Sequence, residues 1–423
     1  MASRATKLLV AVLAFAGAAF GQPTYANQVS RVFRAKCEIC HRDGDIAPFA
    51  LKDYDTAAAW SADIQTVLSN HTMPPWKPVA GFGDFKNSFA LTGDERQTIF
   101  DWIAAGMPFG DPADLLDPLP DQGPWPLGAP DVVLQMPAPF TPARGVDVYR
   151  CFVLPSDLAA PTYLGAVDVQ PGNRQIVHHV LLFVDTTGQA AQMDGQDGSP
   201  GYDCFGGPGI TLNLNSTLGA WAPGQRGQFL PDGVGIPLPA HATVVMQVHY
   251  HPSAYTGPDQ TSVGLYFARS DVEQQLYMIP VLNDSFTIPA GAPNFNVSTS
   301  FQVPPLFDAH LIWIFPHMHL LGRQIKVDVV NPDQTTTPLV YEDNWDFNWQ
   351  GAYTYSSAVP IKAGSTVKLN CAFDNSADNP TNPNNPLVAV GWGERTTDEM
   401  CLAYLGVTLD NENLLPFAKR RRK

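Results

Sequence analysis

The pattern of apolar and polar positions divides the chain into an N-terminal helical part and a longer part built from strands. From about residue 27 to residue 110 apolar residues recur at helical spacing, most clearly around residues 29–33, 57–68 and 94–105. From about residue 131 to residue 410, short β-branched and aromatic runs alternate with Gly, Pro and Asn. The clearest of these runs are residues 243–250, 262–267, 309–314, 325–330, 366–373 and 400–407. The pattern predicts a small all-α domain followed by antiparallel β-structure.

The lengths of these regions predict the domain organisation. About 140 residues suit one antiparallel sandwich, so residues 131–272 and 273–411 are expected to form two tandem β-sandwich (jelly-roll) domains. The helical domain covers residues 22–110, and the acidic, Pro-rich residues 111–130 form a semi-rigid linker. Residues 412–423 are expected to be a solvated basic tail, with contact to an anionic membrane as the alternative. The chain is therefore expected to be mainly β.

Residues 1–21 have the composition of an export signal. Arg4 and Lys7 precede an apolar run over residues 8–20, and Ala19-Phe20-Gly21 offers a cleavage site. A membrane anchor is the alternative, but the run of about 13 residues is too short to span a bilayer. The sequence thus predicts an exported, periplasmic or secreted protein with no transmembrane segment after signal cleavage, whose cysteines meet oxidising conditions.

The helical part carries a motif for covalent heme attachment. Cys37 and Cys40 form the CxxCH motif with His41, in which both thiols bind heme vinyl groups and the histidine becomes an axial iron ligand. A redox-active CxxC pair and half a zinc site are the alternatives. Met73 is the expected sixth ligand and His71 the reserve candidate. The motif predicts a small all-α cytochrome c-like domain in a bacterial protein of the periplasm.

Composition and charge exclude two classes of protein. The 25 Lys and Arg against 40 Asp and Glu give a formal net charge of -15, which argues against nucleic acid as a partner. The 23 Phe, 13 Tyr and 9 Trp exclude intrinsic disorder.

The histidines of the β region occur in clusters: His178 with His179, His249 with His251, and His317 with His319. Residues i and i+2 of a strand share a face, so His317 and His319 can converge on one metal. Adjacent His178 and His179 can do so only at a strand end or a bulge. Imidazoles without matching carboxylates favour copper or zinc.

These clusters and their surroundings resemble the copper type II, ascorbate-dependent monooxygenases. The similar segments are Val177-His178-His179-Val180-Leu181-Leu182-Phe183, Val245-Met246-Gln247-Val248-His249-Tyr250, Pro316-His317-Met318-His319-Leu320-Leu321-Gly322 and Thr397-Asp398-Glu399-Met400-Cys401. They follow the family's order between about residues 131 and 410, and the resemblance does not include the helical domain.

The resemblance implies two separate copper ions. His178, His179 and His249 would bind the copper that delivers electrons, and His317, His319 and Met400 would bind the copper that meets O2. Met318 would pack in the core, and His251 remains an alternative ligand. Tyr404 would either line the substrate pocket or pack between strands.

The resemblance also implies two disulfides, Cys151–Cys204 and Cys371–Cys401. Phe315 and Leu402 stand where the peptide-hydroxylating members carry Arg and Asn. A carboxylate anchor is therefore missing, which favours a smaller, hydrophobic or aromatic substrate. Gly322-Arg323 is closer to the dopamine-hydroxylating branch.

The sequence therefore predicts a monooxygenase that inserts one atom of O2 into an activated C–H bond of a small molecule. Its cofactors are two copper ions and covalent heme c. The heme is the expected relay for electrons from an external reductant, such as a periplasmic reductase, a cytochrome or an ascorbate-like molecule. The alternative is a heme and copper electron-transfer or copper-binding protein that hydroxylates nothing.

Overall fold

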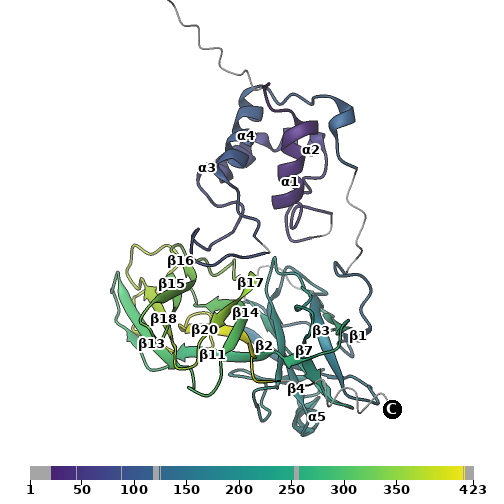
Figure 1. The fold of residues 1–423 in the computed structure, drawn as a ribbon, viewed down its shortest axis with the longest axis vertical. Coiled ribbons are helices and arrows are strands. Elements are labelled where there is room, and N and C mark those ends of the chain that lie inside the picture. The colour runs from purple at the N-terminus through teal and green to yellow at the C-terminus, as the bar shows by residue number, and fades with distance from the viewer. Residues whose placement is uncertain are drawn as a thin grey trace, which may run out of the picture. The chain divides into compact units, whose positions relative to one another are not determined.

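The computed structural model describes residues 21–43, 45–86, 88–117, 123, 125–251, 257–412 and 414. It divides into two compact units (Figure 1). Of the described residues, the first unit contains 21–43, 49–74 and 91–117, and the second contains the rest. The expected signal peptide and most of the basic tail lie outside the described residues, as does part of the linker.

The first unit is helical. A π-helical turn at Tyr25–Val29 leads into four α-helices: α1 (Ser30–Lys36), α2 (Tyr54–Ala59), α3 (Ser61–Ser69) and α4 (Gly93–Ala104). A 3₁₀ turn follows at Pro112–Asp114. The Thr92 side chain accepts from the Glu95 backbone N–H, and the Glu95 carboxylate accepts from that of Thr92, so α4 begins at a capping box. Phe33, Ile99 and Trp102 lie in the buried core of this unit.

The helical pattern predicted over residues 57–68 is interrupted in the structure. Trp60 separates α2 from α3, and its backbone leaves the helical region at φ -95° and ψ 9°. The Trp60 ring stacks on Phe49 with ring centroids 4.1 Å apart. A contact with a residue outside both helices therefore accompanies the break, and apolar spacing alone does not reveal it.

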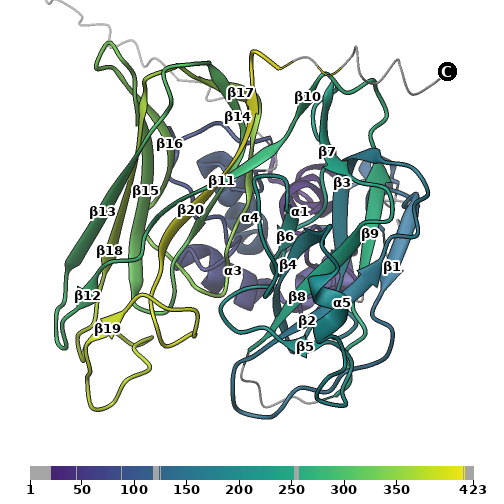
Figure 2. The same ribbon diagram turned by 90° about the horizontal axis from the view of Figure 1, so that it is seen from below.

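The second unit begins with two sheets packed face to face. One sheet has the order β1-β9-β3-β7-β10 and the other β5-β2-β8-β4-β6 (Figure 2). The strands of the first are β1 (Val132–Gln135), β9 (Ser262–Phe267), β3 (Thr162–Gln170), β7 (Val234–Leu238) and β10 (Gln274–Gln275). Those of the second are β5 (Tyr202–Asp203), β2 (Val148–Pro155), β8 (Thr243–Tyr250), β4 (Val177–Asp185) and β6 (Thr217–Trp221). Both sheets contribute to one core that includes Phe152, Val248 and Leu265, and we call this pair the N-terminal sandwich. The short helix α5 (Gln189–Met193) follows β4.

The remaining strands form a second pair of sheets around a core that includes Leu311, Ile325 and Leu405. One sheet has the order β11-β20-β14-β17 and the other β13-β18-β15-β16. Their bounds are β11 (Tyr277–Asn283), β20 (Cys401–Leu409), β14 (Ala309–His317), β17 (Tyr353–Ile361), β13 (Phe295–Gln302), β18 (Thr366–Phe373), β15 (Gly322–Val330) and β16 (Thr336–Glu342). β12 (Thr287–Ile288) pairs with β19 (Val390–Gly391). We call this pair the C-terminal sandwich. The prediction of a mainly β chain with antiparallel sheets is confirmed.

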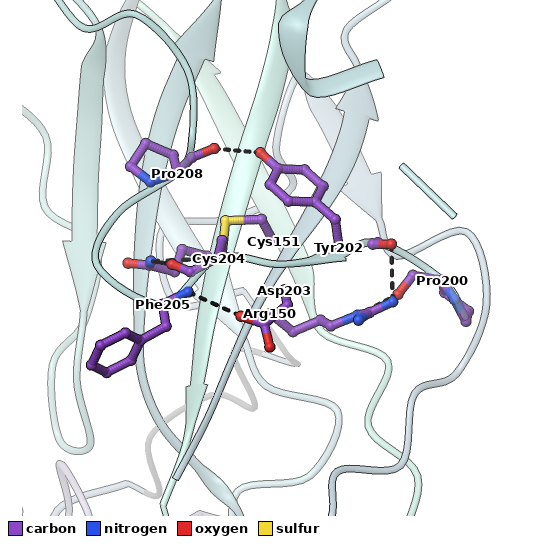
Figure 3. Close-up of a disulfide and its surroundings, with 10 residues drawn as sticks. Arg150, Cys151, Pro200, Tyr202, Asp203, Cys204, Phe205 and Pro208 are labelled. Atoms are coloured by element: carbon purple, nitrogen blue, oxygen red, sulfur yellow. Dashed lines mark hydrogen bonds between the residues drawn. A yellow bond between two sulfur atoms is a disulfide. The ribbon is translucent and has the colours of Figure 1, made fainter. Parts of the chain in front are cut away.

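The prediction of disulfide bonds is also confirmed. Cys151 of β2 is bonded to Cys204, which follows β5, and Cys371 of β18 is bonded to Cys401 of β20. Around the first bond, the Tyr202 hydroxyl donates to the Pro208 carbonyl and Arg150 donates to the Pro200 carbonyl (Figure 3). The second bond joins the two sheets of the C-terminal sandwich at the residue after Met400. Each bond is expected to add about 2 to 4 kcal/mol of stability.

Within residues 75–86, Pro78 bridges to Glu342 of β16 and Phe85 to Tyr355 of β17, at the edge of the C-terminal sandwich, although helices flank this segment in the sequence. The Val79 amide donates to the Tyr341 carbonyl (2.8 Å), and the Lys86 amide donates to the Thr354 carbonyl (3.0 Å). Beneath this segment Glu342 is fully buried. Its Oε1 accepts from the Tyr353 hydroxyl (2.9 Å), and its Oε2 has no hydrogen-bond partner. Burial raises the pKa of Glu342 to about 8.

The raised pKa of Glu342 predicts how stability depends on pH. Between the ordinary glutamate value of 4.5 and about 8, the folded chain holds a proton that the unfolded chain releases. The free energy of unfolding therefore falls as the pH rises through this window, by at most about 1.4 kcal/mol per pH unit for this group. Glu342→Gln removes the contribution of this group to the pH dependence. The free energy of unfolding of the variant, relative to that of the wild type, should therefore increase as the pH rises from 4.5 to about 8. Denaturant unfolding at several pH values measures the difference, with the exposed Glu273→Gln as control. Parallel curves for wild type and Glu342→Gln would contradict the prediction.

Among the described residues, none of the helices is both long enough and apolar enough to cross a bilayer.

Candidate metal centres

Three histidines converge in the N-terminal sandwich because of a β-bulge. His179 of β4 lies directly opposite His249 of β8, and the register shifts between Val177 and His179. The extra residue in this irregularity is His178, so two successive side chains can approach the same point. Adjacent histidines can share a metal only at a strand end or a bulge, and the structure has a bulge at this position.

The ring nitrogens of this cluster have the spacing of metal ligands. His178, His179 and His249 each present one nitrogen, and these atoms all lie within 4.8 Å of one another. The Nδ1 atoms of His178 and His249 lie 3.3 Å and 3.4 Å from Nδ1 of His179. We call these three residues the first histidine site. Three neutral imidazoles at this spacing suit copper or zinc.

A carboxylate orients one ring of the first histidine site. His249 Nε2 lies 2.8 Å from Oδ1 of Asp147, the residue just before β2. Because the carboxylate accepts, Nε2 carries the proton and the lone pair stays on Nδ1, the atom that faces the other two histidines. Burial favours a higher pKa for Asp147, but hydrogen bonds from His249 and Thr396 outweigh it and hold this pKa well below its usual value.

Burial keeps the first site uncharged. It lowers the pKa of His178 and of His179 well below the usual value, and neighbouring imidazoles lower both further. It also lowers the pKa of His249, against the opposing effect of Asp147. Neutral imidazole is the form that binds a metal, so the site is ready for a cation at neutral pH.

A second pair of histidines lies at the end of β14. His317 is the last residue of the strand, and His319 lies two positions further on, just before the turn in which the Gly322 amide donates to the His319 carbonyl. The ring centroids lie 5.1 Å apart. His317 Nδ1 donates to the Gln350 side-chain oxygen (2.7 Å), and His319 Nδ1 donates to the Asp398 carbonyl (3.1 Å). Both rings are therefore left with Nε2 as the atom that can bind a metal.

Met400 lies beside this pair. His317 faces Leu402 across the β14–β20 pairing, so the same register carried past the strand end sets His319 opposite Met400. Glu399 Oε2 accepts from the backbone amides of both His319 (2.9 Å) and Met400 (3.2 Å). The Met400 side chain is buried. We call His317, His319 and Met400 the second site.

The second site is also kept uncharged. Burial lowers the pKa of His317 to about 4 and that of His319 to about 3. Burial raises the pKa of Glu399 to about 8, although the backbone amides that it accepts from favour a lower value. The two imidazoles and the thioether form a neutral, partly soft donor set, which suits Cu(I).

One loop contacts both sites. It runs from Trp345 to Gln350, between β16 and β17, and Gln350 is the residue bonded to His317. The Phe347 ring stacks on His178, with centroids 4.6 Å apart and planes at 19°. The same ring meets His319 edge-on at 5.8 Å. Phe347 is buried, so one buried aromatic ring contacts a histidine of each site.

The other predicted residues of the β region lie as follows. Met318 is fully buried in the core of the C-terminal sandwich. His251 Nδ1 lies 3.6 Å from Asp147 Oδ1, and one ligand atom each of Asp147, His249 and His251 lie within 4.8 Å of one another, so His251 stays an alternative ligand. Tyr404 of β20 faces Phe315 of β14, and its side chain is half-buried. Phe315 in turn stacks near His317, with ring centroids 5.9 Å apart.

The CxxCH motif forms a turn directly after α1. The His41 and Cys40 amides both donate to the Cys37 carbonyl, at 2.9 Å and 3.1 Å. Neither cysteine is in a disulfide. His41 Nδ1 donates to the Phe49 carbonyl (3.1 Å), which leaves Nε2 for an axial bond. Two cysteines outside any disulfide and a histidine oriented in this way fit a covalently attached heme.

The two candidate sixth ligands differ in environment. The Met73 side chain is half-buried, whereas His71 is exposed and its ring contacts the Arg96 guanidinium. His71 also adopts a positive φ of 60°. Met73 stays the predicted sixth ligand, with His71 as the reserve candidate.

Sequence reasoning missed Asp147, Phe347 and Gln350, which touch the candidate ligands from distant parts of the chain. No local spacing signals them, because each contact depends on how strands pair and loops fold back. Glu399 offered a signal, because it precedes Met400 within one of the matching segments.

Comparison with known proteins supports the family that the motifs indicate. Residues 275–407 match the family model described as copper type II ascorbate-dependent monooxygenase, C-terminal domain. The chain is 26% identical to DBH-like monooxygenase protein 1 of Homo sapiens over 258 residues, which cover 56% of this chain and 40% of that protein. It is 24% identical to dopamine beta-hydroxylase of Rattus norvegicus over 313 residues, which cover 66% of this chain and 45% of that protein.

These matches support the resemblance to the copper type II ascorbate-dependent monooxygenases, a family that uses copper as its cofactor. The chain spans about two fifths of the length of the curated relatives it matches. Among solved structures it is similar to a peptide-N(4)-(N-acetyl-beta-D-glucosaminyl) asparagine amidase, at 11% identity and a TM-score of 0.30, covering 66% of this chain and 96% of that chain. A TM-score this low carries no argument.

Proposed function

We propose that the chain is an exported copper monooxygenase that inserts one atom of O2 into an activated C–H bond of a small hydrophobic or aromatic molecule. The observation that carries the proposal is the presence of two different donor sets. One is three histidine nitrogens within 4.8 Å of one another, and the other is two histidines beside a methionine. A protein that only stores copper does not need two unlike sites on two sandwiches.

The residues of both sites fit copper. His178, His179 and His249 would hold one ion through Nδ1, and His317 and His319 would hold the other through Nε2 together with the Met400 sulfur. Copper supplies the one-electron chemistry that O2 activation requires. The chain fixes the histidine tautomers through Asp147, Gln350 and the Asp398 carbonyl.

The surroundings of the second site favour an apolar substrate. Phe315 and Leu402 flank His317, and Tyr404 faces Phe315 on the neighbouring strand. Neither Phe315 nor Leu402 can bind a carboxylate, so the substrate would be recognised by apolar and aromatic contacts. Tyr404 would line the pocket and offer its hydroxyl to a polar group of the substrate.

The proposal includes heme c on Cys37 and Cys40, with His41 and Met73 as axial ligands. Hydroxylation with O2 consumes two electrons besides those of the C–H bond. A heme carried on the same chain would be present at a high effective concentration for passing them on. The first donor is a periplasmic reductase, a cytochrome or an ascorbate-like reductant.

Isotope labelling tests the proposed function. Copper-loaded protein is supplied with ascorbate, ¹⁸O2 and a panel of small arylalkylamines, and products are analysed by mass spectrometry. We expect one ¹⁸O atom in the product, and none from metal-free or zinc-loaded protein. Copper-dependent O2 consumption without an oxygenated product from any member of the panel would instead favour the electron-transfer alternative.

A further inference from the structure

Besides Phe347, a hydrogen-bonded path connects the two metal sites. It begins at His249, which lies between Asp147 and Tyr149. His249 Nε2 is 2.8 Å from Asp147 Oδ1, and the Tyr149 ring stacks on the His249 ring at 4.2 Å with planes 6° apart. The His249 side chain is almost fully buried. These two contacts leave the ring little freedom to rotate.

Both neighbours of His249 also hold a loop of the other sandwich. Asp147 Oδ1 accepts from the Thr396 hydroxyl (2.8 Å), and the Tyr149 hydroxyl donates to the Glu394 carbonyl (2.6 Å). Glu394 and Thr396 belong to the segment 394–400, between β19 and β20, which we call the 394–400 loop. The N-terminal sandwich therefore holds this loop through the same two residues that hold His249.

The far end of the 394–400 loop belongs to the second site. The Asp398 carbonyl accepts from His319 Nδ1, Glu399 accepts from the His319 amide, and Met400 ends the loop. The loop is stiffened internally, because the Arg395 amide donates to Asp398 Oδ2 (3.0 Å) and the Asp398 amide donates to the Arg395 carbonyl (2.9 Å). Only Thr397 separates Thr396 from Asp398. A shift of Thr396 would therefore move the groups that orient His319 and Met400.

We propose that Asp147 is a positioning residue that couples metal binding at the two sites through Thr396. This inference rests on the proposed function. A metal on His249 Nδ1 keeps the ring proton on Nε2. The Nε2–H group then stays bonded to Asp147, and the carboxylate stays in place against the Thr396 hydroxyl. The 394–400 loop is then held in the arrangement that presents His319 and Met400 to the second metal. Because such coupling is reciprocal, copper at the second site also tightens the first.

A double-mutant cycle with Cu(I) alone tests the coupling. His179→Ala empties the first site and leaves the bond between Asp147 and Thr396 in place. Thr396→Val removes the hydroxyl that joins the loop to Asp147, and Thr396→Ser keeps it. The affinity of the second site is measured by competition with a colorimetric Cu(I) chelator. X-ray absorption identifies that site by its sulfur ligand.

We expect His179→Ala to weaken Cu(I) binding at the second site about tenfold, within the usual range of coupling between sites. In the Thr396→Val background, His179→Ala should weaken Cu(I) binding at the second site less than about twofold. In the Thr396→Ser background, it should again weaken that binding about tenfold. Thermal unfolding of each variant checks that the fold persists. An equal effect of His179→Ala with and without Thr396→Val, or no effect in either background, would overturn the coupling.

Failure of the proposed function gives a different result. Coupled binding of two copper ions without any oxygenated product would leave the coupling standing and remove the hydroxylase. Hydroxylation together with independent binding of the two copper ions would leave the proposed function standing and remove the coupling.

Discussion

Met400→Ala is expected to abolish oxygenation of substrate, with a loss of more than about 100-fold, since losing a metal ligand should cost at least as much as losing a residue that only orients one. The variant lacks the one soft donor of the second site, while His317 and His319 keep their bonds to Gln350 and Asp398. Two imidazoles alone hold Cu(I) less well than two imidazoles with a thioether. Product formation and copper content per chain are measured together. The second site should lose copper, and the first should keep it.

Met318→Leu is the matched control for Met400→Ala. Met318 lies between the same two histidines in the sequence but is fully buried in the core of the C-terminal sandwich. Replacing it with a side chain of similar volume should cost less than about 1.5 kcal/mol of stability and leave oxygenation close to that of the wild type. Retained oxygenation in Met400→Ala, or its loss in Met318→Leu, would contradict the assignment of the second site.

The double variant Cys37→Ala/Cys40→Ala is expected to lose all covalently bound heme. Neither cysteine is in a disulfide, and Cys37 only partly buries its side chain against the core that contains Phe33 and Trp102, so alanine at these positions should cost little packing. Heme staining of the denatured protein on a gel measures the covalent attachment. Copper content should remain at two ions per chain, since the proposed copper ligands all lie in the second unit.

His71→Ala and Met73→Ala complete the test of the heme assignment. His71 is exposed, so its replacement should leave the optical spectrum of the heme unchanged. Met73→Ala should change that spectrum, because the iron loses its sixth ligand. Full covalent heme in the double cysteine variant would contradict heme attachment at Cys37 and Cys40. A zinc ion bound by these cysteines in the wild type would favour the alternative that they are half of a zinc site.

The strands could be predicted from the sequence because their alternation is local. The runs at residues 243–250, 262–267 and 366–373 coincide with β8, β9 and β18. β18 has a buried side chain at every second position and is followed by Asp374, whereas β8 and β9 are almost continuously buried runs of mainly β-branched and aromatic residues. The break at Trp60 could not be predicted in the same way, because it accompanies a contact with Phe49, which lies eleven positions earlier in the chain.

The candidate ligands could be proposed from the sequence because they lie within short segments. Their arrangement could not. The sequence predicted that His317 and His319 share a strand face, and in the structure β14 ends at His317 with His319 two positions beyond it. Asp147 and Thr396 lie 249 positions apart and meet only because two sandwiches pack together. Residues that orient a metal ligand from another domain leave no local pattern.

The central claim is that this chain holds two copper ions in unlike donor sets. X-ray absorption at the copper edge, on protein loaded anaerobically with Cu(I), tests it most directly. The account predicts two copper ions per chain, nitrogen ligands from imidazole at both, and one sulfur ligand for every two copper ions, which is absent in Met400→Ala. A single copper ion per chain, or two copper ions without a sulfur ligand, would contradict it.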